Sequence, residues 1–199
     1  LLPLDAAAEH DGSVAGLATT AYARVQYWQV LQDADPLALI AAPYHRAPQI
    51  GWRGIGRPWD SGPELSFEAE ANRFRLTRSD PGNPQRPDGE RVHLLAQASH
   101  TWRGPGAWFT PRAALSVARY RTDEPMSDGR TRASRAVPTL SLDGGLQLER
   151  DAQWGPRHLT QTLEPRVLYV NTPYRSQDSL PLFDTAAKDF NAISVFSDN

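Results

Sequence analysis

Residues 137–150 read VPTLSLDGGLQLER and carry the clearest structural pattern in the sequence. Leu140, Leu142, Leu146 and Leu148 fall on alternate positions, and mostly polar residues fill the positions between them. Successive side chains of a β-strand point to opposite faces of the sheet. This period of two therefore predicts a strand with one apolar face and one polar face.

The same alternation recurs along the chain. We expect further strands at residues 17–31, 49–53, 64–77, 90–103, 107–121 and 157–170. The 17 Pro and 14 Gly leave few uninterrupted windows for a helix. The sequence thus predicts about seven strands. Most of them reach the length of about 9–11 residues that a tilted strand needs to cross a bilayer. Pro165 has no N–H to donate, so the last strand should bulge or kink there.

The connections between these strands alternate in length. Residues 104–106 and 151–156 form short turns, whereas residues 77–90, 121–137 and 171–190 form long loops. Membrane barrels combine short periplasmic turns with long extracellular loops. Aromatic residues near the strand ends would suit the two membrane interfaces: Trp52, Trp59, Trp102, Trp108, Tyr120, Trp154, Tyr169 and Tyr174. These patterns fit either a membrane barrel or a soluble β-sandwich.

Composition excludes several other classes of protein. No run of about 18 apolar residues exists, so we expect no spanning helix, and the first residues carry no visible signal peptide. The net charge of −2 argues against a nucleic-acid binder. The chain has no cysteine. His93 and His100 should lie on opposite faces of one strand, which opposes a shared metal.

Two sets of charged residues allow both a functional interpretation and a simpler one, in which they are only solvated. Glu68 and Glu70 share a strand face, and a retaining glycosidase needs two carboxyl groups about 5–5.5 Å apart, but solvated lumen residues are the simpler interpretation. Arg130, Arg132 and Arg135 are expected in one loop, where they are either merely solvated or in contact with surface phosphates. We expect no catalytic, metal-binding or cofactor-binding residue.

Residues 160–166 read TQTLEPR, and Tyr169 and the PYR of residues 173–175 follow. Together with residues 134–151, 27–33 and 43–49, this signature resembles the LptD family, also called the organic-solvent-tolerance proteins. The resemblance covers residues 22–199. Its signature residues in this chain are Thr160, Gln161, Thr162, Leu163, Glu164, Pro165, Arg166, Pro173, Tyr174 and Arg175.

The resemblance implies an all-β fold, namely an antiparallel up-and-down transmembrane β-barrel. Residues 1–199 would be a partial barrel domain, incomplete at both ends, and residues 190–199 would approach a further strand. About seven strands cannot close such a barrel, so we expect an open, curved sheet with unpaired edges. Such a sheet should not fold stably by itself in water.

The resemblance also implies a function in the outer membrane of a Gram-negative bacterium. The family inserts lipopolysaccharide into the outer leaflet, without an enzymatic step or a cofactor. Implied partners are an LptE-type plug lipoprotein, lipopolysaccharide, outer-membrane lipids, and periplasmic bridge proteins that act through an N-terminal domain. Candidate lumen-facing residues are Arg24, Glu68, Glu70, Arg112, Glu164 and Arg166. The alternatives are a general porin-type channel and a soluble β-sandwich that binds carbohydrate or cleaves it with Glu68 and Glu70.

Overall fold

The computed structural model describes residues 2–29, 43–76, 86–155 and 157–183. The elements in these residues are β1 (Leu2–Val14), β2 (Leu17–Gln29), β3 (His45–Gly56), β4 (Glu64–Arg75), β5 (Gly89–Ser99), β6 (Trp102–Arg103), β7 (Ala107–Thr122), β8 (Arg132–Leu146), β9 (Leu148–Trp154), β10 (Arg157–Leu163) and β11 (Arg166–Asn171). The expected strand end at residues 30–31 and the expected approach to a further strand at residues 190–199 lie outside the described residues.

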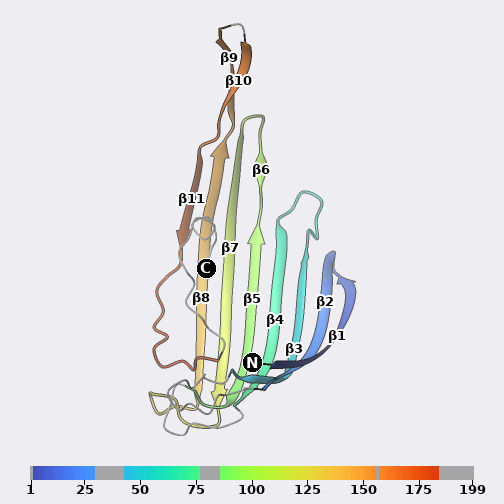
Figure 1. Ribbon diagram of the computed structural model, residues 1–199, viewed down its shortest axis with the longest axis vertical. Helices are drawn as coiled ribbons and strands as arrows, with labels where there is room; N and C mark the ends of the chain where they lie inside the picture. The colour runs from blue at the N-terminus through green and yellow to red at the C-terminus, as the bar shows by residue number, and fades with distance from the viewer. Residues whose placement is uncertain (1, 30–42, 77–85, 156, 184–199) are drawn as a thin grey trace.

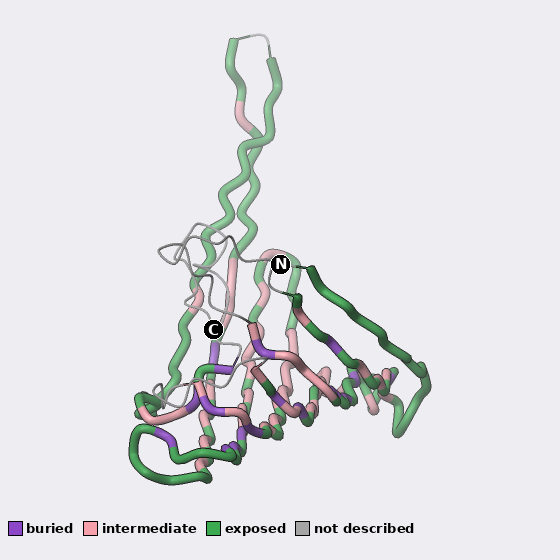
Figure 2. The backbone as a smooth tube through the Cα atoms, turned by 60° about the horizontal axis from the view of Figure 1, so that its bottom comes forward, coloured by how far each residue is buried: buried purple, intermediate pink, exposed green. Residues whose placement is uncertain are grey.

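Most strands pair with their neighbours in sequence, always antiparallel (Figure 1). One nine-stranded sheet has the order β1-β2-β3-β4-β5-β7-β8-β11, with β6 paired to β7. Figure 2 shows this sheet bent into a trough. The expected open antiparallel sheet is therefore confirmed. A β-sandwich needs a second sheet packed face to face on the first, but the other sheet in the described residues is only a two-stranded hairpin. The sandwich alternative is wrong.

The structure corrects the number and bounds of the strands. β1 was not expected, and it joins β2 through Ala15 and Gly16, whose positive φ values of 50° and 80° suit a two-residue hairpin turn. β8 begins at Arg132 rather than at residue 137. The interruption expected at Pro165 is present between β10 and β11, where Pro165 O accepts a bond of 3.0 Å from Leu146 N.

The expected short turn at residues 151–156 lies at the tip of a longer projection. β9 and β10 form a hairpin that extends beyond the end of the main sheet (Figure 1). Nearly all of its residues are exposed (Figure 2). The hairpin leaves the sheet at the end opposite the long loops, so the end with short turns also carries this extension.

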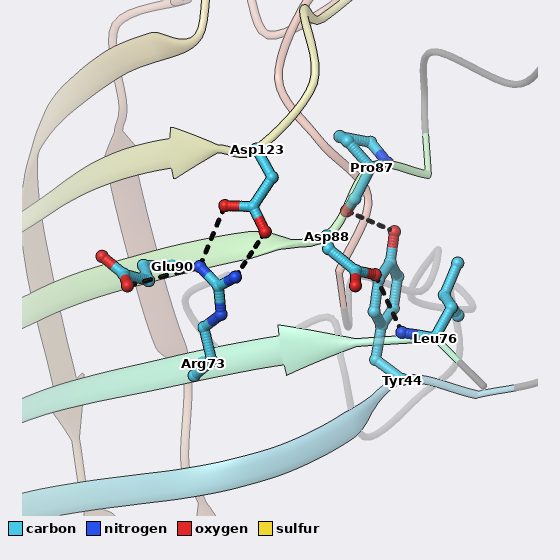
Figure 3. Close-up of polar contacts among 7 residues, drawn as sticks. All are labelled: Tyr44, Arg73, Leu76, Pro87, Asp88, Glu90 and Asp123. Atoms are coloured by element: carbon cyan, nitrogen blue, oxygen red, sulfur yellow. Dashed lines mark hydrogen bonds and ion pairs between the residues drawn. The ribbon is translucent and has the colours of Figure 1, made fainter. Parts of the chain in front are cut away.

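A small core lies at the end of the sheet that carries the long loops. Phe183 stacks on Phe74 with ring centroids 4.3 Å apart and meets the edge of Tyr44 at 5.3 Å. Ala118 and Tyr120 complete this cluster. The Tyr44 hydroxyl donates to Pro87 O at 3.0 Å (Figure 3). Tyr120 therefore packs inside the core, and its expected place at a membrane interface is wrong.

Candidate functional site: the polar face and its groove

The strand register divides the sheet into two chemically different faces. Tyr22, Gly51, Glu70 and His93 lie in one row across β2 to β5. Residues that pair directly in an antiparallel sheet share a face, and alternate residues along each strand belong to it too. We call this side, which also carries Glu68, Asn72 and Arg91, the polar face. The opposite side, with the row Trp52, Ala69, Leu94 and Val117, is the apolar face.

Glu70 is the centre of a hydrogen-bond network on the polar face. Its carboxylate accepts bonds from the Tyr22 hydroxyl at 2.6 Å and from Gln49 Nε2 at 2.7 Å. Asn72 Nδ2 donates a third bond, and Arg91 adds an ion pair at 3.6 Å. Only 12% of the Glu70 side chain is exposed. Since four polar partners from four strands surround this carboxylate, Glu70 ties β2, β3, β4 and β5 together.

Gly51 makes room for this network. The Tyr22 ring lies over Gly51, where a Cβ atom would collide with it. A side chain at residue 51 would push Tyr22 aside and away from Glu70. The glycine is therefore required by the close approach of a ring to the backbone rather than by a turn.

A groove of about 750 Å³ crosses the polar face over β5, β7, β8 and β11. Arg112, Arg135 and Arg166 line it, and Asp143 is an acidic residue in its wall. Most of the remaining lining consists of hydroxyl and amide groups, and four apolar side chains lie between them: Gln97, Thr110, Ser116, Thr139, Ser141, Thr172 and Gln177, with Leu95, Ala114, Val137 and Leu168. Guanidinium groups bind planar oxyanions through paired N–H donors, and hydroxyl groups both donate and accept. This lining is suited to a ligand that carries both negative charge and hydroxyl groups.

Individual contacts fix the cations at the two ends of the groove. Arg166 donates to Asp143 at 2.9 and 2.6 Å, and its guanidinium lies 5.6 Å from the centre of the Trp108 ring. Trp108 thus lies on the polar face, and its expected place at a membrane interface is wrong. Arg135 donates to the side chain of Gln177.

The segment that follows β11 closes one side of the groove. Thr172 and Thr139 share a hydroxyl hydrogen bond of 2.9 Å, and Gln177 accepts the bond from Arg135. Phe183 then inserts into the aromatic core. Residues 172–183 therefore run along the polar face from β11 to the end with the long loops. We call this segment the strap.

Most of the candidate lumen-facing residues share the polar face. Arg24 pairs with Asp5 of β1, with Nε donating at 2.8 Å. Glu68 lies two residues before Glu70 on β4, and Arg112 and Arg166 line the groove. Glu164 lies between β10 and β11, in neither strand, and is exposed.

The signature residues of the sequence divide among three elements. Thr160, Gln161, Thr162 and Leu163 belong to the exposed strand β10, Glu164 and Pro165 form the interruption, and Arg166 opens β11. Pro173, Tyr174 and Arg175 are exposed residues of the strap. Of the ten signature residues, Arg166 lines the groove.

Several residues of the site were not expected from the sequence. Tyr22, Gln49 and Asn72 surround Glu70, while Arg135 and Asp143 line the groove. Except for Asn72, which shares β4 with Glu70, each of these residues meets its partner from another strand or from the strap. Alternation within a strand gives the face of such a residue, but its partners depend on the register.

The part of the chain that the structure describes contains neither a membrane-spanning helix nor a cluster of metal ligands. No helix there is long and apolar enough to span a membrane. No group of three or more His, Asp or Glu side chains in the same residues could hold a metal ion.

Comparison with known proteins gives a consistent result. Residues 8–199 match the model of the LptD family, described as LPS transport system D. The chain is 41% identical over 176 residues to the LPS-assembly protein LptD of Acidovorax sp. (strain JS42) and 42% identical over 176 residues to that of Albidiferax ferrireducens. Each alignment covers 88% of this chain and 21% of the relative.

A third relative, the LPS-assembly protein LptD of Burkholderia thailandensis, is 38% identical over 179 residues. The chain thus spans about a fifth of the length of the curated relatives that it matches. The sheet of the described residues agrees with the barrel that the resemblance implied, and the family model covers nearly every residue. The chain belongs to the LptD family.

Proposed function

We propose that this chain forms part of the wall of a β-barrel that transports lipopolysaccharide to the outer leaflet of the bacterial outer membrane. One observation carries the proposal: a single-layered sheet has a hydrogen-bonded polar face and, on its other side, an exposed apolar face. The names of the relatives, LPS-assembly protein, supply the cargo. No covalent bond changes in such transport, so we propose neither an enzymatic step nor a cofactor.

The apolar face supports a position against lipid. Large apolar side chains on it are exposed in the described chain, among them Ile50, Trp52, Val92, Leu94, Leu115, Leu140, Leu142 and Tyr169. Monomeric soluble proteins rarely expose a contiguous apolar surface larger than a few hundred Å². Hydrocarbon tails would cover this surface without leaving polar groups unsatisfied.

The polar face is then the lumen wall. The groove with Arg112, Arg135 and Arg166 would contact phosphate and hydroxyl groups of the sugar portion as it passes. Each of these contacts would be weak and easily replaced by another, which suits a lipopolysaccharide that must move along the lumen. A general porin would have the same two faces, but the family model and the relatives favour lipopolysaccharide as the cargo.

The sheet requires neighbouring strands at both of its edges. Within the described residues β1 pairs only with β2, and β11 pairs only with β8. Unpaired strand edges expose N–H and C=O groups, which is unfavourable inside a bilayer. We therefore propose that residues 1–199 are a partial barrel domain, continued by further strands on both sides. An LptE-type plug lipoprotein in the lumen and periplasmic bridge proteins complete the proposed assembly.

The experiment is a charge reversal in the groove of the full-length protein. We expect Arg112→Glu/Arg166→Glu to lower the amount of newly made lipopolysaccharide at the cell surface and the yield of co-purified plug protein. Arg103→Glu/Arg157→Glu is the matched control, because both residues are exposed and lie outside the groove. If the groove variant delivers as much lipopolysaccharide and retains as much plug as the control, this face does not line the transport path.

A further inference from the structure

Three arginines form an exposed patch on the apolar face, at the end of the sheet that carries the long loops. Arg121 of β7 pairs directly with Arg132 of β8. Arg119 precedes Arg121 by two residues on β7 and therefore points to the same side. All three side chains are exposed. Arg119, Arg121 and Arg132 are called the arginine patch. Arg132 and Arg135 were expected in one loop with Arg130, but both belong to β8 and lie on opposite faces.

Within the described residues no hydrogen bond or ion pair neutralises this patch, although Glu90 of β5 pairs with Arg121 in the strand register. None of its three guanidinium groups has a hydrogen bond, ion pair or ring contact within the described ranges. The acids beside it, Glu90 and Asp123, are both engaged by Arg73, which donates at 3.3 Å to Glu90 and at 3.1 Å to Asp123 (Figure 3). The patch is therefore a local excess of positive charge.

The direct pairing of Arg121 with Arg132 is unfavourable by itself. Side chains that face each other across antiparallel strands are about 5 Å apart at Cβ, and like charges there destabilise the sheet. An anion between the two guanidiniums would turn this repulsion into attraction. Phosphate oxygens match the paired N–H donors of arginine, so a phosphate is a fitting occupant.

The surroundings of the patch indicate what carries the phosphate. The next row on the same face, toward the middle of the strands, is Leu94, Val117 and Ala136, and the row beyond it contains Leu115. A ligand held at the patch therefore continues onto an exposed apolar surface. A lipid has both parts, with its headgroup phosphate at the arginines and its acyl chains along the apolar rows. A free phosphate would use only the first part.

We propose that the arginine patch binds the headgroup phosphate of an anionic lipid in the leaflet at the long-loop end of the barrel. This inference rests on the proposed function, because it needs the apolar face to lie against lipid. In a membrane barrel the long loops are extracellular, which places the patch at the level of the outer-leaflet headgroups. The patch thus anchors the height of this part of the wall.

The test titrates lipids onto the full-length protein in detergent, with bound lipid counted by native mass spectrometry. The probes are dioleoyl phosphatidic acid and the zwitterionic dioleoyl phosphatidylcholine. We expect the protein to prefer phosphatidic acid. Arg121→Gln/Arg132→Gln should weaken that binding by about 30-fold, the factor for two arginines that each contribute about 1 kcal/mol near anionic lipid. Arg121→Lys/Arg132→Lys keeps both positive charges but lacks the paired N–H donors of the guanidinium groups, so it should lose only part of the affinity for phosphatidic acid.

Arg103→Gln/Arg157→Gln removes the same charge far from the patch and should leave the titration unchanged. Equal binding of phosphatidic acid by the protein and by Arg121→Gln/Arg132→Gln overturns the inference. Displacement of the lipid by an equal concentration of inorganic phosphate overturns it too, because the patch would then be an ion site. A protein that does not insert into bilayers refutes the proposed function, whereas one that inserts and transports with an unchanged titration refutes this inference alone.

Discussion

At the scale of single residues, a carboxylate that is withdrawn from water needs donors and a cation to match its charge. Glu70 meets this condition through Tyr22, Gln49, Asn72 and Arg91. Glu68, two residues away on the same face, has no side-chain hydrogen bond or ion pair shown within the described residues. Two acids that look alike in the sequence thus differ in role.

Replacement of Glu70 should destabilise the barrel, while replacement of Glu68 should not. Glu70→Ala leaves three donors and Arg91 without their acceptor, at an expected cost of about 3 kcal/mol. Glu68→Ala is the matched control and should change stability by about 0.5 kcal/mol or less. Urea unfolding of the full-length protein in detergent micelles measures both. Equal losses for the two variants would contradict the central role of Glu70.

Tyr44 predicts how stability depends on pH at the loop end. Burial raises the pKa of the Tyr44 phenol to about 12, against about 10 in the unfolded chain. Because the fold retains the proton that the unfolded chain loses, the contribution of Tyr44 is complete below pH 10 and is lost as the pH rises toward 12. Tyr44→Phe should therefore reduce the fall in stability between pH 9 and pH 11.5, as measured by thermal unfolding.

The control for this pH dependence is Tyr174→Phe, because the Tyr174 side chain is 82% exposed in the strap. The Tyr174→Phe variant should show the same fall in stability between pH 9 and pH 11.5 as the unchanged protein. A Tyr44→Phe variant with the same slope as Tyr174→Phe would show that ionisation at Tyr44 is not coupled to folding.

At the scale of strands, the alternation of apolar and polar residues predicts a difference between neighbouring positions. Leu94 and Leu95 follow each other on β5, but Leu94 lies on the apolar face and Leu95 lines the groove. Leu94→Arg should cost about 2–4 kcal/mol, as arginine does on the lipid face near the bilayer midplane. Leu95→Arg places the same charge at the same depth in a polar surface, so folding should be affected less.

Folding into liposomes, followed by the heat-dependent shift of the folded band on a gel, compares the two leucine variants. Leu95→Arg should fold nearly as well as the unchanged protein and instead narrow the groove. If Leu95→Arg prevents folding and Leu94→Arg does not, the assignment of the two faces is reversed.

The strands also show which parts of the fold a sequence pattern can predict. β4 and β7 were predicted nearly to their ends, because their apolar residues keep a clean period of two. β1 was missed because the alanines at residues 6–8 and the polar residues after them do not alternate. The start of β8 was missed because Arg132 and Ser134 resemble a loop. A strand that is held in place mainly by pairing with a neighbour shows little alternation in its own sequence.

The candidate site was predictable to a similar extent. Arg112 and Arg166 were expected in the lumen and do line the groove. Arg135 was expected in a loop and Asp143 was not selected as a site residue, because only the register brings them beside Arg166 and the strap. The contact of Phe183 with Phe74 joins residues far apart in the chain through the path of the strap. No period within one strand encodes such a contact.

At the scale of the whole molecule, the described sheet has two free edges and few buried apolar side chains. Those buried apolar residues are Tyr44, Phe74, Ala118, Tyr120, Met126 and Phe183. All of them except Met126 form one core at one end of the sheet, so little apolar burial supports its middle. A single layer of this kind depends on lipid on one side and on neighbouring strands at both edges.

This dependence predicts that residues 1–199 expressed alone will aggregate in water. The edges of β1 and β11 would pair with other copies, and the apolar face would associate. The same strands within the full-length protein should instead yield a detergent-soluble monomer, since adjacent strands cover both edges. Light scattering after chromatography without detergent measures the first case, and chromatography in detergent micelles measures the second. A monodisperse monomer of residues 1–199 in plain buffer would mean that the sheet supports itself, and the proposal of a larger barrel would lose its physical basis.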